Sequence, residues 1–129
     1  MPANLTGHTL DWCRKRGMVA GVTEQWLRIP GGRSVRRDWA GFGDVIAIGP
    51  ASVLVIQVTS RRNVASRVAK IRDIVFVNHW ESIFIGNPVC RIVVHGWDQP
   101  GGKGKAWRLL ERDPFEQEHS DGQVDEFAS

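Results

Sequence analysis

The chain has 129 residues, of which 42% are hydrophobic and 24% are charged. A chain of this size builds one hydrophobic core, which favours a single compact domain. It has neither the apolar segment of a secretory leader nor a run of about 18 apolar residues, so we expect a cytoplasmic protein without membrane contact. Its two cysteines, Cys13 and Cys90, are too few and too far apart for a disulfide framework or a structural zinc site.

Positive charge is unevenly distributed, although the net charge is only +3. The basic segments are residues 13–16, 33–37, 61–72 and 103–108. Residues 111–126, in contrast, are mostly acidic. This asymmetry predicts a folded body over residues 1–112 with a positive face suited to a polyanion. An acidic and flexible C-terminal tail over residues 113–129 is expected to follow.

Capping, turn and apolar patterns predict the elements of the first half. Thr9 can cap a short helix that ends at Gly17. A strand is expected over residues 18–29, and residues 33–39, after a Pro-Gly-Gly turn, are expected to lead into a second strand. The two apolar runs that follow are separated by a short turn and predict a hairpin. These runs are residues 45–48 and 53–58.

The second half begins with the best-defined helix of the sequence. Ser60 or Asn63 can cap it, and apolar residues then recur at three- and four-residue spacing. These apolar positions are Val64, Val68, Ile71 and Val75. Strands are expected over 89–97 and 106–110. The order is helix, three strands, helix, two strands, which predicts an α/β domain with a mixed central sheet flanked by helices.

Three polar residues stand where the two central strands meet. Asp44 precedes the first run, and Gln57 and Thr59 lie two residues apart at the end of the second, so their side chains share a face. A buried amide without partners costs about 1–3 kcal/mol, so Gln57 within an apolar strand indicates a polar site. The alternatives are a turn aspartate that binds nearby backbone amides and a polar outer face of the strand.

Gly43-Asp44 and Gln57-Val58-Thr59, followed by a basic helix, resemble the metal-site strands of the PD-(D/E)XK, or restriction-endonuclease-like, nuclease superfamily. The similarity is greatest to small Holliday-junction-resolvase-like and phage-borne nucleases and covers about residues 10–97. The resemblance implies one restriction-endonuclease-like domain. In that family an aspartate after a turn joins an acidic-X-Lys tripeptide. Here the acidic residue is an amide, Gln57, and the lysine is a hydroxyl, Thr59.

The resemblance also implies hydrolysis of DNA assisted by Mg²⁺ or Mn²⁺. Asp44 and the Gln57 side-chain oxygen, with a backbone carbonyl, would hold the ion. Glu24, which we prefer to Asp38 for this role, would add a carboxylate. The implied catalytic set is Asp44, Gln57, Thr59 and Lys70. Arg61, Arg62, Arg67 or Lys70 can replace the missing lysine, and we prefer Lys70 of the following helix.

Basic residues flank this candidate site and are expected to hold the phosphates of DNA, including branched or single-stranded DNA. They are Arg36, Arg37, Arg61, Arg62, Arg67 and Lys70. Many small nucleases of this superfamily act as dimers, so we expect a homodimer. Trp80, Ile83, Phe84 and Ile85 are candidates for its interface and equally for the core.

Two alternatives to a nuclease stay open. In the first, loss of the acidic residue and the lysine leaves a catalytically inactive DNA-binding module on the same fold. In the second, the chain is a phage-type accessory or inhibitor protein that acts on a protein partner through its acidic C-terminal segment. Metal-dependent cleavage and salt-sensitive DNA binding distinguish the three functions.

Overall fold

The structure is a computed structural model that describes residues 5–23, 25–29, 33–37, 39–116 and 125–127. Within these residues the helices are α1 (Leu5–Lys15), α2 (Val64–Val77) and α3 (Glu81–Phe84), and a 3-10 turn, η1 (Arg61–Asn63), leads into α2. The strands there are β1 (Val19–Val22), β2 (Gln25–Ile29), β3 (Arg33–Arg37), β4 (Val45–Ile48), β5 (Val53–Ser60), β6 (Cys90–Asp98), β7 (Arg108–Arg112) and β8 (Asp125–Phe127).

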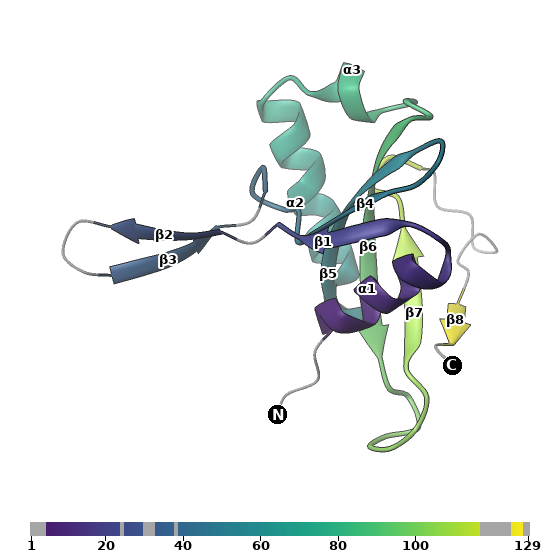
Figure 1. Cartoon of the computed structure of the whole chain (residues 1–129). Helices are drawn as coiled ribbons and strands as arrows, with labels where there is room; N and C mark the ends of the chain where they lie inside the picture. Colours follow the sequence, from purple (N-terminus) through teal and green to yellow (C-terminus); the bar gives the residue numbers. More distant parts are fainter. Residues whose placement is uncertain (1–4, 24, 30–32, 38, 117–124, 128–129) are drawn as a thin grey trace.

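A mixed sheet in the order β1-β4-β5-β6-β7-β8 forms the centre of the molecule. β5 and β6 are parallel, and the other neighbouring pairs are antiparallel. α1 and α2 lie on opposite faces of this sheet (Figure 1). If the β2–β3 hairpin and the short α3 and β8 are set aside, the predicted order of helix, three strands, helix and two strands is confirmed, as is the α/β class.

Each face of the sheet has its own apolar core. All four positions predicted for the apolar stripe of α2 are buried, and they pack on the side chains of β5 and β6 that point to that face. On the other face, Cys13 of α1 packs on side chains of β4, β5 and β6. Cys13 and Cys90 are free cysteines, as expected, and burial raises the pKa of the Cys13 thiol to about 11.

Two predicted boundaries are wrong. α1 begins at Leu5, so Thr9 lies inside the helix. The Thr9 hydroxyl does not cap the helix, because it makes buried tertiary contacts. The strand expected over 18–29 is two strands. β1 ends at Val22, where the backbone N–H of Thr23 donates to the Asp44 carbonyl, and β2 then pairs with β3 in a separate two-stranded sheet.

The residues proposed for a dimer interface divide between core and surface. Phe84 is buried and Trp80 packs against the same core, so these two belong to the body of the protein. Ile83 and Ile85 are 47% and 40% exposed. They stay candidates for a homodimer contact.

The chain keeps contact with the body beyond Arg112, where the sequence predicts that the body ends. Pro114 is buried and Phe115 packs against the core on the α2 face. Asp113 lies 3.3 Å from Arg91 of β6, and β8 pairs with β7. Among the described helices, none has both the length and the apolar composition that crossing a lipid bilayer requires.

A buried chain of hydrogen bonds joins α1 to β6 and β7. The indole N–H of Trp97 donates to Thr9 Oγ1 over 2.9 Å, and Thr9 Oγ1 lies 3.2 Å from His95 Nδ1. His95 Nε2 lies 2.8 Å from Glu111 Oε2. Every polar hydrogen of this chain has an acceptor if the Thr9 hydroxyl donates to Nδ1 and the Nε2 N–H donates to the Glu111 carboxylate. Thr9 and His95 are fully buried, so this chain fixes α1 on the sheet.

Glu111→Gln is expected to remove an acid-sensitive part of the stability. Burial alone would raise the Glu111 pKa, but the hydrogen bond to His95 and the electrostatic interactions with His95, Arg91 and Arg16 hold this pKa below its ordinary 4.5. A depressed carboxyl pKa gives stability that is complete above the unfolded-state pKa and is lost as pH falls through the folded-state pKa.

Urea unfolding of the wild type and Glu111→Gln across acidic pH measures this contribution. The difference in unfolding free energy should be constant near neutral pH and should shrink as pH falls below the ordinary glutamate value. A difference that stays the same at all acidic pH values would show that Glu111 is not held ionised by its neighbours.

Candidate metal and nucleic-acid site

A tight turn presents Asp44 at the start of β4. Trp39 and Gly43 form a bridge, and between them Ala40 and Gly41 both have positive φ, of 54° and 85°. A positive φ is uncommon for alanine, and such strained positions gather at functional sites. A Cβ added to Gly43 would lie 3.0 Å from a Val55 methyl, so this turn packs directly on β5.

Asp44 is buried against the end of β5. Its side chain is 5% exposed, and its Oδ2 accepts a hydrogen bond from the backbone N–H of Val58 over 2.8 Å. Its own N–H donates to the Ile56 carbonyl. These two bonds join β4 to β5 and fix the direction of the carboxylate. Removing a carboxylate from water is costly unless hydrogen bonds or a cation compensate, so this burial indicates a specific role.

Gln57 lies beside Asp44 and is equally buried. The register pairs Val45 with Ile56, which places Asp44 opposite Gln57. Gln57 is 3% exposed, its Nε2 lies 3.5 Å from Asp44 Oδ2, and its Oε1 has no hydrogen-bond partner among the residues that the structure describes. A buried acceptor without a donor costs about 1–3 kcal/mol. The amide therefore lacks a group that would satisfy its oxygen.

The contact between the two side chains is weak as a hydrogen bond. At 3.5 Å it is longer than the 2.7–3.2 Å of an ordinary N–H···O bond. The amide turns its nitrogen toward Asp44 and leaves its oxygen without a partner among the described residues. Carboxylate and amide oxygens are ligands that Mg²⁺ accepts. Asp44 and Gln57 therefore have the donor atoms that a divalent metal ion requires.

Thr59 lies two residues further along β5 on the same face. Val55 belongs to the core on the α2 side, and side chains alternate along a strand, so Gln57 and Thr59 also point to that side. Thr59 is 6% exposed. The structure therefore brings Asp44, Gln57 and Thr59 together under the first turns of α2, as the sequence predicts.

One flank of α2 faces the loop that precedes β4. A Cβ placed on Gly41 of that loop would lie 3.5 Å from Ile74 Cδ1. Arg67 and Lys70 precede Ile74 by seven and four residues and therefore share its flank. The opposite flank carries Arg72, whose Nε donates to a backbone carbonyl after β7. Arg67 and Lys70 are thus on the side of α2 that faces the Asp44 turn, and both are half-buried.

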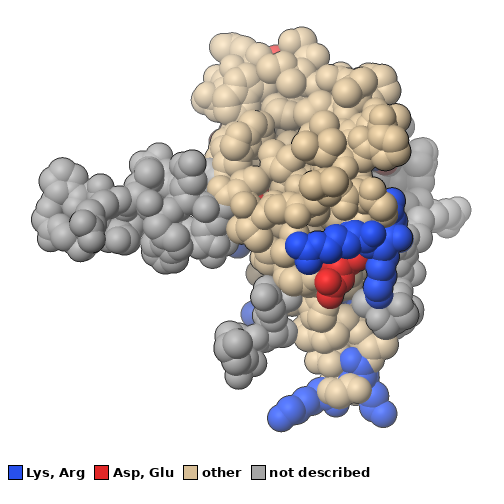
Figure 2. Space-filling model, in the orientation of Figure 1, with Lys and Arg blue, Asp and Glu red and all other residues tan. Residues whose placement is uncertain are grey.

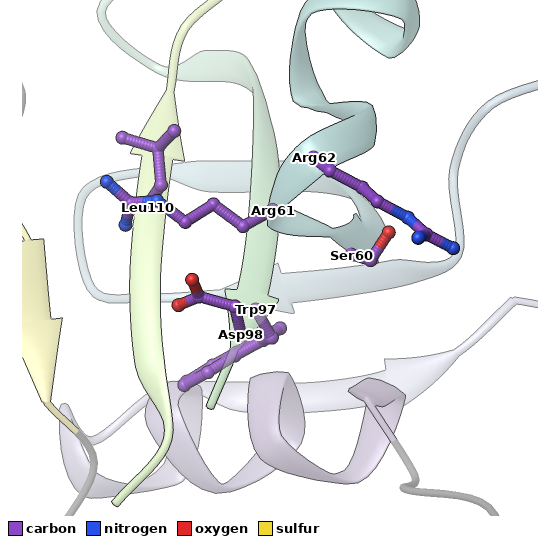
Figure 3. A pocket seen from close by; sticks show the side chains of 6 residues that line it. All are labelled: Ser60, Arg61, Arg62, Trp97, Asp98 and Leu110. Atoms are coloured by element: carbon purple, nitrogen blue, oxygen red, sulfur yellow. The ribbon is translucent and has the colours of Figure 1, made fainter. Parts of the chain in front are cut away.

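A pocket of about 480 Å³ opens at the same end of the sheet, where β5 passes into η1. Its lining residues are Ser60, Arg61, Arg62, Trp97, Asp98 and Leu110 (Figure 3). Arg61 and Arg62 point in opposite directions from the start of the helix, Arg61 toward β7 (Figure 3). Asp98 accepts two hydrogen bonds from Arg108, at 3.0 and 2.7 Å. Arg61, Arg62 and Arg108 outnumber the single carboxylate of Asp98, so the region around the pocket carries a net positive charge.

The sequence did not indicate that Trp97 and Asp98 belong to this region. They come to it because the parallel register pairs Ser60 with Trp97, a contact between residues 37 positions apart. A parallel register is set by long-range packing and has no local sequence signal. The backbone N–H of Val58, which orients Asp44, was likewise not predicted.

Three predicted site residues are not placed by the structure. Glu24 lies outside the described residues, directly after Thr23. Arg36 and Arg37 belong to β3, whose backbone is described without its side chains. Over the described residues, no group of three or more His, Cys, Asp or Glu side chains could hold a metal ion. A metal site at Asp44 therefore depends on the Gln57 amide and backbone oxygens, with Glu24 as the additional carboxylate expected from the sequence.

Comparison with protein-family models, with curated proteins and with solved structures finds no match for this chain. The resemblance to restriction-endonuclease-like nucleases thus depends on the motif residues themselves.

Gly96→Ala is expected to displace the start of α2 from the site. A Cβ on Gly96 would lie 2.2 Å from a Val64 methyl and 3.0 Å from Arg61 Cα, so η1 and α2 must move. Such overpacking costs about 1–3 kcal/mol. The control is Gly21→Ala on β1, where nothing lies within 4 Å of the added Cβ.

Chemical denaturation of both variants measures this effect. Gly96→Ala should lower the free energy of unfolding by the stated amount, whereas Gly21→Ala should change it by less than about 0.5 kcal/mol. Equal stability of the two variants would contradict close packing of η1 on β6.

Proposed function

We propose that the chain is a metal-dependent DNA nuclease of the restriction-endonuclease-like type, with an amide in place of one metal-binding carboxylate. The observation that carries this proposal is the buried Gln57 oxygen, which has no partner in the described part of the chain and lies next to the buried Asp44 carboxylate. A structural polar pair would be expected to satisfy its own hydrogen bonds. A pair that leaves an oxygen unsatisfied is suited to a ligand with positive charge.

The residues fit Mg²⁺ or Mn²⁺, which prefer oxygen ligands. Asp44 and the Gln57 oxygen would hold the ion, with a backbone carbonyl at the end of β5 and Glu24 as further ligands. When bound, such an ion lowers the pKa of a coordinated water and stabilises the charge that develops on the phosphate.

The side chains around this pair have separate tasks in the proposed reaction. The Val58 N–H holds the Asp44 carboxylate in one orientation, so little reorganisation is needed when substrate binds. Lys70 and Arg67 lie on the flank of α2 that faces the Asp44 turn. They supply the positive charge that comes from the motif lysine in the family. Thr59 occupies the position of that lysine, where its hydroxyl can bind a phosphate oxygen or a water. Arg61 and Arg62 hold neighbouring phosphates.

A second candidate function is DNA binding without cleavage. It is favoured by the neutral side chain of Gln57, which gives the site one negative charge fewer than the family motif. In this case Asp44 and Gln57 remain a structural pair bridged by water, and the basic residues bind DNA in a salt-sensitive way. The third function, action on a protein partner through the acidic C-terminal segment, concerns residues that lie mostly outside the described part of the chain.

Cleavage of labelled DNA with and without Mg²⁺ or Mn²⁺ tests the proposed function. Linear duplex, single-stranded and four-way-junction DNA should be compared. Asp44→Asn should lower the cleavage rate by at least about 100-fold, because it removes the one described carboxylate of the metal site. Gln57→Leu should have a similar effect, whereas Gln57→Glu should retain activity and bind Mn²⁺ more tightly.

Asp73→Asn is the matched control, because Asp73 is an exposed carboxylate on α2. This variant should cut like the wild type. Metal-dependent cutting that survives Asp44→Asn would place the active site elsewhere. Intact DNA in every lane, combined with salt-sensitive binding, would favour the non-catalytic module.

A further inference from the structure

We propose that the β2–β3 hairpin is an arm that binds along the major groove of duplex DNA beside the phosphate at Asp44. The choice of DNA as partner rests on the proposed function. The substrate would then have a double-stranded segment next to the position of cleavage. Such binding also assigns a role to the two-stranded sheet, which is separate from the main sheet.

The hairpin projects from the body of the protein (Figure 1). Within the described part of the chain, β2 and β3 pair with each other and with no strand of the main sheet. An isolated two-stranded hairpin is only marginally stable in water. A bound surface along its length would stabilise it, which favours a binding role over a structural one.

The root of the hairpin adjoins the candidate metal site. Before β2, the Thr23 N–H donates to the Asp44 carbonyl over 3.0 Å. After β3, the Trp39 N–H donates to the Gly43 carbonyl over 3.0 Å, and the Gly43 N–H donates back over 2.7 Å. Both strands thus leave the body at the turn that presents Asp44. A nucleic acid with a phosphate at Asp44 therefore passes next to the hairpin.

The composition of the two strands suits a polyanion. Gln25–Ile29 and Arg33–Arg37 contain four arginines and no aspartate or glutamate. Arginine side chains bind DNA phosphates and form bidentate contacts with guanine edges in the major groove. The two strands of the hairpin therefore carry a net positive charge.

The register separates the positions of the hairpin into two faces. Trp26 is opposite Arg36, and Arg28 is opposite Ser34, so these four positions share one face. All four can donate hydrogen bonds. The other face has Leu27 opposite Val35 and is apolar at its centre. We assign the face with Trp26 and Arg36 to the DNA.

The dimensions of the hairpin match a DNA groove. Five residues of β-strand span about 17 Å at about 3.4 Å per residue. The major groove of B-DNA is about 12 Å wide and admits a two-stranded ribbon, whereas the deep and narrow major groove of duplex RNA does not. The arm should therefore prefer duplex DNA to duplex RNA and to single strands.

Fluorescence anisotropy without a divalent metal ion, in EDTA, tests this inference separately from catalysis. The probes are one sequence as duplex DNA, single-stranded DNA and duplex RNA, at several salt concentrations. Arg28→Gln/Arg36→Gln removes two charges from the assigned face, and Arg33→Gln/Arg37→Gln removes two from the other. Arg14→Gln/Lys15→Gln removes two exposed charges at the end of α1, where Figure 2 shows Lys and Arg side chains gathered away from the hairpin.

The wild type should bind duplex DNA most tightly. Arg28→Gln/Arg36→Gln should weaken that binding about 10- to 100-fold and lower the salt slope by about two. Arg33→Gln/Arg37→Gln should have a smaller effect, and Arg14→Gln/Lys15→Gln should have none. Thermal unfolding should be unchanged in the two hairpin variants, because over the described residues β2 and β3 pair with no strand of the main sheet.

Unchanged duplex binding by Arg28→Gln/Arg36→Gln would overturn the inference, and so would an equal loss in all three variants. Equal affinity of the wild type for duplex RNA or single strands would also overturn it. If the wild type binds duplex DNA as expected but cuts no DNA with metal, the proposed nuclease function fails while the role of the arm stands.

Discussion

The parallel pairing of β5 with β6 is the constraint on which the rest of the structure depends. Two adjacent parallel strands need a crossover connection, which here consists of η1, α2 and α3 on one face of the sheet. α2 must then start where β5 ends, directly above Gln57 and Thr59. Gly96 of β6 permits this close approach, since no side chain separates β6 from η1. The basic start of α2 and the polar end of β5 are therefore brought together by topology.

The polar pair at this position opposes stability unless it has a further partner. Asp44 and Gln57 are both buried at the level of core residues, and no described residue satisfies the amide oxygen of the pair. Apolar residues would fill the same place at lower cost. The positive φ of Ala40 in the preceding turn adds to the free-energy cost of folding this region. Strain and unsatisfied polarity at one site are typical of a binding centre, in contrast to the Thr9–His95–Glu111 chain, which satisfies its own hydrogen bonds.

The local parts of this arrangement could be predicted from the sequence. The antiparallel hairpin of β4 and β5 has a short turn, so the placement of Asp44 near Gln57 follows from counting residues along two apolar runs. The buried stripe of α2 follows from its helical spacing. Both features depend on contacts between residues close in the chain, where periodicity and turn signals are informative.

The non-local parts could not be predicted. The sequence from Met18 to Ile29 has no glycine-proline break at Thr23, so the departure of β2 from the sheet has no local signal. Thr9 has the residue type of a helix cap, but its burial against Trp97 and His95 overrides that preference. The contact of η1 with Gly96 likewise depends on the register of strands far apart in sequence.

The proposed function requires that Asp44 and Gln57 form a site for a divalent metal ion. Anomalous diffraction from crystals of the full chain soaked in Mn²⁺ tests it most directly. An anomalous peak is expected within about 2.0–2.4 Å of an Asp44 carboxylate oxygen and of Gln57 Oε1. A Gln57 oxygen that accepts a hydrogen bond from water or protein, with no Mn²⁺ peak beside Asp44, would contradict it.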